Sequence, residues 1–333
     1  MKLKKRRLTL EEYVEGVKRG DRFVLSRAIT LVESNLEADI QIAQGVLEQL
    51  LPFTGRAIRI GITGVPGVGK STFIETFGQY LLQSGKKIAV LAIDPSSQKT
   101  KGSIMGDKTR MEALSNDPRA YIRPSSTGST VGGVARKTRE AMLLCEAAGF
   151  DTILIETVGV GQSEVAVKGM VDFFLLLMLA GAGDELQGIK KGIMEMADAI
   201  AITKADGKNL EKAKRAKVEY QNALHLFRRS ASGWSPRVLT CSALEKTNLD
   251  KTWELICKYW EQMHEKGWIA QNRAQQNLYW MKETIQESLV NRFYTHPGIV
   301  TKLSEVEAKV ASGHVPAYAA AKELLNIYTG NKE

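Results

Sequence analysis

The stretch of sequence that decides the fold reads Gly64-Val65-Pro66-Gly67-Val68-Gly69-Lys70-Ser71. It matches the phosphate-binding loop pattern, in which a glycine and four residues precede Gly-Lys-Ser. An apolar run at 58–63 predicts a buried strand before the loop, and apolar residues at helical spacing predict a helix over 72–83. The alternative is a glycine-rich turn with a surface lysine. The strand and the helix on either side favour the phosphate-binding loop.

Each part of this loop has a predicted role. Glycines let backbone N–H groups surround a phosphate, and the N-terminus of the following helix adds partial positive charge. Lys70 can reach the β- and γ-phosphates, and the Ser71 hydroxyl can ligate Mg²⁺. The predicted nucleotide contacts therefore run from Gly64 to Thr72, with Lys70 also assigned to catalysis.

Composition places the chain among soluble globular proteins. The 333 residues are 44% hydrophobic and 25% charged, which suits one large domain with additions, or two domains. The apolar run at 173–180 has the length of a buried strand, so no membrane association is predicted. The basic segment at 1–7 is not followed by an apolar signal region. The three cysteines lack metal-ligand spacing and predict free thiols in the cytoplasm.

The net charge of +9 has two candidate explanations. Much of it lies at 2–7 and 208–229, where a solvated helix face is favoured over a nucleic-acid surface, because aromatic residues do not alternate with the basic ones. Nucleic acid is therefore not a predicted partner. The four histidines are scattered, which argues against a metal site built from protein ligands alone.

Strands alternate with helices through the middle of the chain. Helices are predicted over 9–51, and Pro52 and Gly55 then interrupt the pattern. Short strands rich in Val, Ile and Leu follow at 58–63, 87–93, 152–155, 173–179, 199–203 and 237–240. This layout is typical of an α/β fold with a doubly wound, mostly parallel sheet. The predicted domains are an N-terminal helical extension at 1–55, a P-loop domain that binds a nucleotide at 56–262 and a helical C-terminal arm at 263–333.

The C-terminal arm has no strand signal after Trp260. Amphipathic helices are predicted near 301–312 and 317–328. Such an appendage is too small to hold a core alone, so it is expected to pack on the nucleotide domain or on a second subunit.

Two aspartates are candidate metal ligands. Asp94 ends the second strand, where it can hold Mg²⁺ directly or through water, although Asp-Pro-Ser also favours a turn. Asp107 lies in the polar segment 99–110, and it is either a second acid on the metal or a loop or helix-capping residue.

The third predicted strand end carries Glu156. Many GTPases have Asp-x-x-Gly at this point, and the glycine N–H contacts the γ-phosphate, as Gly159 is expected to do here. Glu156 replaces the aspartate and can contact the water shell of the metal or orient the attacking water. Gln162 and Glu164 are weaker candidates for that second role.

A glycine-rich segment follows the next strand at 180–192. It is either a flexible connection into a helix or a further switch, in which Gln187 and Lys190 swing toward the nucleotide or a partner.

Two further strand ends carry guanine-reading patterns. The sequence Thr-Lys-Ala-Asp at 203–206 resembles Asn-Lys-x-Asp, and Ser242-Ala243-Leu244 resembles Ser-Ala-x. Asp206 can accept two hydrogen bonds from guanine, which adenine cannot donate. The Lys204 stem covers the base, and the Ala243 N–H can bond the guanine oxygen. Either pattern alone is weak, but both in order after a P-loop predict GTP and GDP as ligands.

The combination of motifs at 64–71, 92–97, 156–164 and 183–192 resembles the MeaB/ArgK GTPases, which are chaperones of adenosylcobalamin-dependent methylmalonyl-CoA mutase. The resemblance covers essentially the whole chain. It implies a homodimer built through the C-terminal arm, and a GTPase that gates cofactor loading and protects or reactivates the mutase. It also implies Mg²⁺ handling by Ser71, Asp94 and Asp107, with Glu156 near the hydrolytic water, and a switch containing Gln187 and Lys190.

One residue departs from the family pattern, because Thr203 stands where the family has asparagine. That asparagine braces the P-loop, so weaker bracing is expected. The alternative functions are a metal-delivery GTPase of related fold, which would need a Cys/His cluster, and an ATPase or kinase linked to lysine/arginine/ornithine transport.

Overall fold

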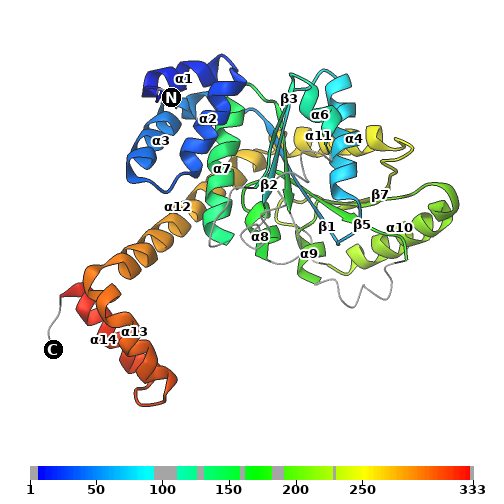
Figure 1. Ribbon diagram of the computed structural model, residues 1–333. Coiled ribbons are helices and arrows are strands. Elements are labelled where there is room, and N and C mark those ends of the chain that lie inside the picture. The colour runs from blue at the N-terminus through cyan, green and yellow to red at the C-terminus, as the bar shows by residue number, and fades with distance from the viewer. Residues whose placement is uncertain are drawn as a thin grey trace. The chain divides into compact units, whose positions relative to one another are not determined.

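The strand that leads into the P-loop lies at the centre of a parallel sheet (Figure 1). The computed structural model describes residues 7–93, 111–125, 131–157, 162–181, 191–227 and 230–330. The sheet has seven strands in the order β3-β2-β4-β1-β5-β6-β7, and every neighbouring pair is parallel. This confirms the predicted α/β class with a doubly wound sheet.

Six of the seven strands lie where the sequence predicts them. Their bounds are β1 Ile58–Gly64, β2 Ile88–Ile93, β4 Thr152–Thr157, β5 Phe173–Met178, β6 Ala199–Ile202 and β7 Arg237–Thr240. The remaining strand, β3 (Ala120–Arg123), was not predicted. This strand has only four residues, lies at the edge of the sheet and is half-buried at its second half, so its apolar signal is short.

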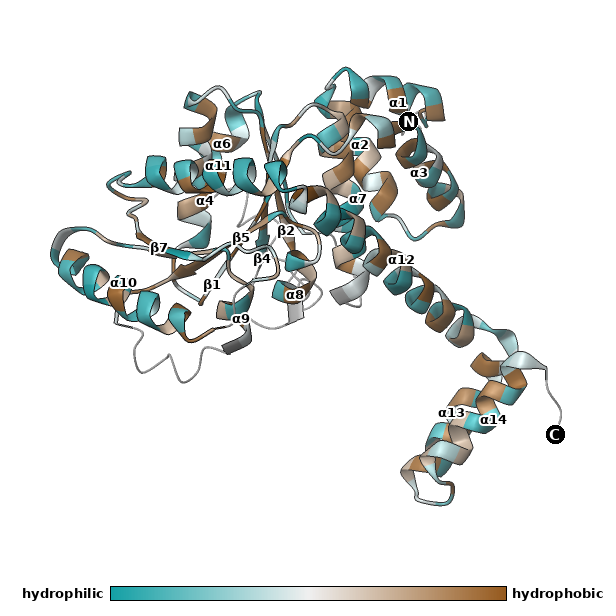
Figure 2. Ribbon diagram, turned by 180° about the vertical axis from the view of Figure 1, so that it is seen from behind, coloured by the Kyte–Doolittle hydropathy of each residue, from teal (hydrophilic) through white to brown (hydrophobic). Residues whose placement is uncertain are grey.

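Helices cover both faces of the sheet. One face carries α4 (Lys70–Gln83), α6 (Glu112–Asn116) and α11 (Leu249–Glu265), whose side chains join a single buried cluster with β1, β2 and β5. The other face carries α7 (Val131–Ala147), α8 (Gln162–Lys168), α9 (Lys191–Met196) and α10 (Leu210–His225). Figure 2 shows the strands mainly in brown and the outer side of α11 mainly in teal, as expected for a sheet buried between two helical layers.

Three helices precede the sheet, as predicted. They are α1 (Leu10–Lys18), α2 (Arg22–Glu33) and α3 (Glu37–Leu50), with a 3-10 turn at Leu51–Phe53. The Thr9 side chain accepts a hydrogen bond from the Glu12 N–H, and the Glu12 side chain accepts one from the Thr9 N–H. This capping box explains why α1 begins where it does. All three helices pack against α7.

The C-terminal part is helical, with α12 (Trp268–Thr295), α13 (Pro297–Ala311) and α14 (Ala317–Thr329). The chain divides into two compact units, Met1–Gln276 and Asn277–Glu333. In the second unit, α13 and α14 bury a small cluster of their own: Ile299, Val306, Ala320 and Leu324. The three-part division at 1–55, 56–262 and 263–333 remains a prediction.

Among the described residues, no helix is long and apolar enough to span a membrane.

Candidate nucleotide-binding site

The P-loop connects β1 directly to α4. The helix begins at Lys70, two residues earlier than predicted, which places Lys70 and Ser71 in its first turn. Gly67 and Gly69 have φ values of 75° and 90°, in the left-handed region that favours glycine. The N-cap residue of α4 is Gly69, and no side chain caps the helix there. The first N–H groups of α4 therefore remain available to bind a ligand. An uncapped helix N-terminus beside a glycine loop is suited to bind an anion.

Lys70 folds back over its own loop. Its Nζ donates a hydrogen bond of 2.8 Å to the Gly64 carbonyl. Burial lowers the pKa of the Lys70 ammonium, while the carboxylates of Glu156 and Glu164 act to raise it. A phosphate bound at the loop would therefore interact with the Lys70 ammonium, on which the charges of Glu156 and Glu164 already act.

Glu156 approaches Ser71 from the neighbouring strand. The register of β1 and β4 pairs Ile62 with Glu156, which brings this carboxylate to the end of β1. The Ser71 Oγ donates to Glu156 Oε1 over 3.4 Å. Just beyond, the buried Thr157 hydroxyl donates to the Thr63 hydroxyl over 2.8 Å and links the two strand ends.

The Ser71 and Glu156 oxygens fit the chemistry of Mg²⁺. This ion prefers oxygen ligands and usually takes one or two from the protein, completing its shell with phosphates and water. In the described part of the chain, no cluster of three or more His, Cys, Asp or Glu residues could hold a metal. A Mg²⁺ site of the P-loop kind does not need one, whereas a dedicated metal-delivery site does.

Thr203 braces the P-loop in spite of its shorter side chain. Its Oγ1 donates to the Val68 carbonyl over 2.8 Å and has the Met178 carbonyl 3.3 Å away as a second acceptor. Lys204 adds a hydrogen bond of 2.9 Å from its Nζ to the Gly67 carbonyl. The loop is thus held by two adjacent residues at the end of β6.

The two predicted base-reading segments lie side by side. Strands β6 and β7 pair Ile202 with Thr240, so the loops that follow them leave the sheet together. The Ser242 hydroxyl donates to the Asp206 carboxylate and accepts from the Glu245 N–H over 3.1 Å. Ala243 is half-buried and Leu244 is 82% exposed. The Asp206 carboxylate is therefore oriented by a serine from the neighbouring loop.

Sequence reasoning missed two asparagines that shape these loops. Asn209 donates from Nδ2 to the Lys204 carbonyl over 2.7 Å, which supports Lys204 in a left-handed conformation with φ 53°. Asn248 donates from Nδ2 to the Thr240 carbonyl over 2.9 Å. Their positions a few residues after strand ends are typical of turn-stabilising asparagines, a signal that was present in the sequence.

Glu164 was only a weaker candidate for orienting the attacking water. In the structure its carboxylate lies near enough to the P-loop to act on the Lys70 ammonium. It is 1% exposed, in the first turn of α8. Five predicted site residues lie outside the described part of the chain: Asp94, Asp107, Gly159, Gln187 and Lys190.

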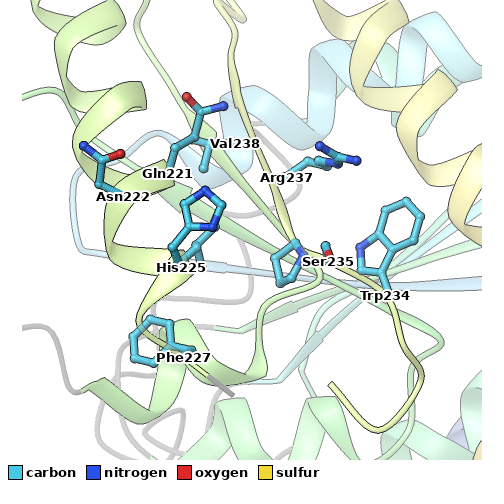
Figure 3. A pocket seen from close by; sticks show the side chains of 10 residues that line it. Gln221, Asn222, His225, Phe227, Trp234, Ser235, Arg237 and Val238 are labelled. Atoms are coloured by element: carbon cyan, nitrogen blue, oxygen red, sulfur yellow. The ribbon is translucent and has the colours of Figure 1, made fainter. Parts of the chain in front are cut away.

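A separate pocket of about 680 Å³ lies between the end of α10 and the start of β7 (Figure 3). Figure 3 shows Gln221 and His225 on α10 facing the segment that holds Ser235 and Arg237. The pocket is at the amino end of β7, whereas Asp206 and Ser242 follow the carboxyl ends of β6 and β7. It is therefore not part of the nucleotide site.

A P-loop, a paired serine and acid, and two adjacent segments that match guanine-reading patterns are the features expected of a P-loop GTPase. Residues 25–298 match the family described as methylmalonyl-CoA mutase-associated GTPase MeaB. The chain belongs to this family and is a GTPase.

Relatives and a solved structure agree with this assignment. GTPase ArgK of Escherichia coli K12 is 46% identical over 86% of this chain and 87% of that protein. The mouse protein named methylmalonic aciduria type A homolog, mitochondrial, is 46% identical over 94% of this chain and 78% of the relative. A crystal structure of a LAO/AO transport system kinase matches with a TM-score of 0.75 and 37% identity, over 96% of this chain and 97% of the other. The resemblance seen in the sequence is confirmed.

Proposed function

We propose that this GTPase gates adenosylcobalamin loading into a cobalamin-dependent acyl-CoA mutase, of the methylmalonyl-CoA mutase type, and protects or reactivates that enzyme. The observation that carries the proposal is the family match over 25–298, because that family is described by its association with this mutase. The base-reading loops support guanine as the recognised base. The predicted cytoplasmic location, supported by the free thiols at Cys145, Cys241 and Cys257, is part of the same proposal.

We assign a role to each part of the predicted site. Lys70 binds the β- and γ-phosphates. Ser71 and Glu156, together with Asp94 and Asp107, would hold Mg²⁺, which when bound would supply positive charge against the charge that develops on the phosphates. Glu156 is placed to orient the attacking water, and Gly159 contacts the γ-phosphate. Gln187 and Lys190 form the switch that reports the nucleotide state to the mutase.

Hydrolysis by the protein alone is expected to be slow. Within the described residues, no arginine side chain hydrogen-bonds to residues 64–72. An arginine that stabilises transition-state charge typically accelerates such reactions by about 10³–10⁵. A partner that orders the switches is therefore expected to raise the rate.

The coupling is tested by measuring GTP turnover with and without a purified methylmalonyl-CoA mutase. We expect turnover to rise and the two proteins to co-elute in size-exclusion chromatography. The controls are the mutase alone, and the mixture with the Lys70→Ala variant. Unchanged turnover together with the absence of a complex would refute the coupling.

Base reading is tested with Asp206→Asn. The amide nitrogen cannot accept a hydrogen bond, so GTP affinity is expected to fall by about 1.5–3 kcal/mol, roughly 10- to 150-fold. The variant should gain affinity for xanthosine triphosphate, whose carbonyl replaces the guanine amine. Asp250→Asn, at an exposed position in the first turn of α11, is the matched control. Equal GTP affinity in both variants would exclude Asp206 as the base reader.

We also propose that the protein is a homodimer that pairs through α12. The large apolar side chains on this helix that are more than half exposed include Leu278, Met281, Ile285 and Leu289. Spacings of three and four residues place them on one face of the helix. An exposed apolar stripe of this kind usually marks a surface that another protein covers. A second copy of the chain is the occupant that the family resemblance implies.

A further inference from the structure

The first turn of helix α8 carries Glu164. Glu164 is buried, and its negative charge acts on the Lys70 ammonium. A terminal phosphate on the nucleotide would bring a further negative charge to the same ammonium. Because like charges repel, the presence of that phosphate changes the electrostatic environment of Glu164 and of the helix that carries it.

The body of α8 is close-packed against the sheet. A Cβ atom placed on Gly61 in β1 would come within 2.8 Å of Val167 and 3.1 Å of Val171. Both valines are fully buried. Since no space separates them from β1, a displacement of α8 has to move its neighbours rather than be absorbed by a void.

The far end of α8 is bonded to α12. Gln276 Nε2 donates to the Val171 carbonyl over 2.8 Å and lies 3.4 Å from the Lys168 carbonyl. One turn earlier on the same helix, Arg273 Nε and Nη2 donate to the two Asp172 carboxylate oxygens over 2.8 and 2.6 Å. The loop between α8 and β5 is thus held by side chains of α12.

Arg273 and Gln276 differ in the number of hydrogen bonds that hold their side chains. Arg273 also donates to the Gly55 and Ala57 carbonyls, each over 2.6 Å, so it joins α12 to the base of β1 as well. Among the described residues, Gln276 bonds only the Lys168 and Val171 carbonyls, at the end of α8 and in the loop before β5. Its Oε1 is buried, and no described residue donates a hydrogen bond to it. A buried amide that is only half satisfied can gain a bond when its neighbours shift.

We infer that Gln276 is a positioning residue that couples α8 to α12, so that the state of the terminal phosphate reaches the helix that continues into the second unit. The path begins with the charge interaction between Lys70 and Glu164 and follows α8 to Lys168. It then reaches Gln276 through the hydrogen bonds to the Lys168 and Val171 carbonyls. This inference rests on the proposed nucleotide site and specifies how that site would report its state. Its test does not involve the mutase, so its failure is distinguishable from failure of the proposed coupling.

The experiment compares Gln276→Met with Gln275→Met in the full chain. Methionine nearly preserves the shape of glutamine and removes the hydrogen bonds. Gln275 is exposed and one position earlier on α12, which makes it a matched control. Amide hydrogen exchange is measured for each protein with GDP and with a non-hydrolysable GTP analogue. Affinities for both nucleotides and intrinsic GTP turnover are measured in parallel.

In the wild-type protein and in Gln275→Met, exchange over 162–172 and 277–295 should differ between the two nucleotides. In Gln276→Met the difference at 162–172 should persist, while that at 277–295 should be lost. Because coupling is reciprocal, the ratio of analogue to GDP affinity should also shift in this variant alone, with intrinsic turnover unchanged.

Two results would overturn the inference. One is a wild-type protein in which exchange at 277–295 is the same with both nucleotides. The other is a Gln276→Met protein that keeps the full difference and the wild-type affinity ratio. If Gln276→Met fails to fold, as judged by circular dichroism, Gln276→Leu is measured against Gln275→Leu with the same criteria.

Discussion

Thr203 stands where the family has an asparagine. Its hydroxyl has one proton to donate to the P-loop, whereas an asparagine amide has two. That proton is donated to Val68, with Met178 as the more distant acceptor. Lys204 adds a second bond to the same loop through Gly67. The loop is thus bonded by two adjacent residues, and the expectation that threonine braces it less than asparagine stays a prediction.

Removal of this hydroxyl is expected to weaken nucleotide binding. Thr203→Val keeps the shape of the side chain and leaves the Val68 carbonyl without its donor, which should lower GDP affinity by about 1 kcal/mol, roughly fivefold. The measurement is a titration with a fluorescent GDP analogue. Thr203→Ser, which retains the hydroxyl, is the control and should bind nearly as the wild type does. Equal affinity in the valine and serine variants would show that the bond does not brace the loop.

At the scale of elements, a buried ion pair joins the start of β1 to the end of α7. Arg59 Nε and Nη2 donate to the two Glu146 oxygens over 2.7 and 3.0 Å, and the Gly55 N–H donates to Glu146 over 2.6 Å. The two side chains are 7% and 1% exposed. Burial, followed by the charge of Arg59, holds the pKa of the nearby Arg139 below its usual range. Glu146 thus offsets positive charge at the base of the P-loop strand.

Loss of Glu146 should therefore be strongly destabilising. Glu146→Ala leaves the Arg59 guanidinium buried without its partner, which is expected to lower the free energy of unfolding by about 3–5 kcal/mol. Urea denaturation followed by circular dichroism measures this change. Glu254→Ala, at an exposed position on α11, should change stability by less than about 0.5 kcal/mol. A loss below about 1 kcal/mol for Glu146→Ala would contradict the importance given to this pair.

At the scale of the whole molecule, the second unit offers a surface that its own residues do not cover. Ile285 is 51% exposed at the middle of the stripe formed by Leu278, Met281, Ile285 and Leu289. A charge at this position would have to be desolvated in any interface that covers the stripe. Assembly through α12 should therefore be sensitive to a single substitution there.

We expect Ile285→Glu to be monomeric under conditions in which the wild type is dimeric. Light scattering coupled to size-exclusion chromatography measures the mass directly. Gln286→Glu introduces the same charge at the adjacent exposed position and should remain dimeric. A monomeric wild-type protein, or a dimeric Ile285→Glu protein, would refute the proposed interface.

Much of the site could be predicted because its residues follow strand ends. In a parallel sheet these ends lie along one edge, so Lys70, Glu156, Asp206 and Ser242 were expected to converge. In the structure, Glu156 lies beside Ser71 and its charge acts on Lys70, while Ser242 bonds Asp206. Strand β3 was missed because four residues at a sheet edge leave too short an apolar pattern.

The sequence by itself determined the fold class, the P-loop, the order of the nucleotide-contacting motifs and the family. These follow from local patterns, since glycine positions, apolar runs and motif spacing are set along the chain. Only the tertiary structure decided that Lys204 assists Thr203, that Glu164 is buried near Lys70, and that Gln276 bonds the end of α8. These contacts join residues that are far apart in sequence, and the packing of helices on the sheet determines which of them meet.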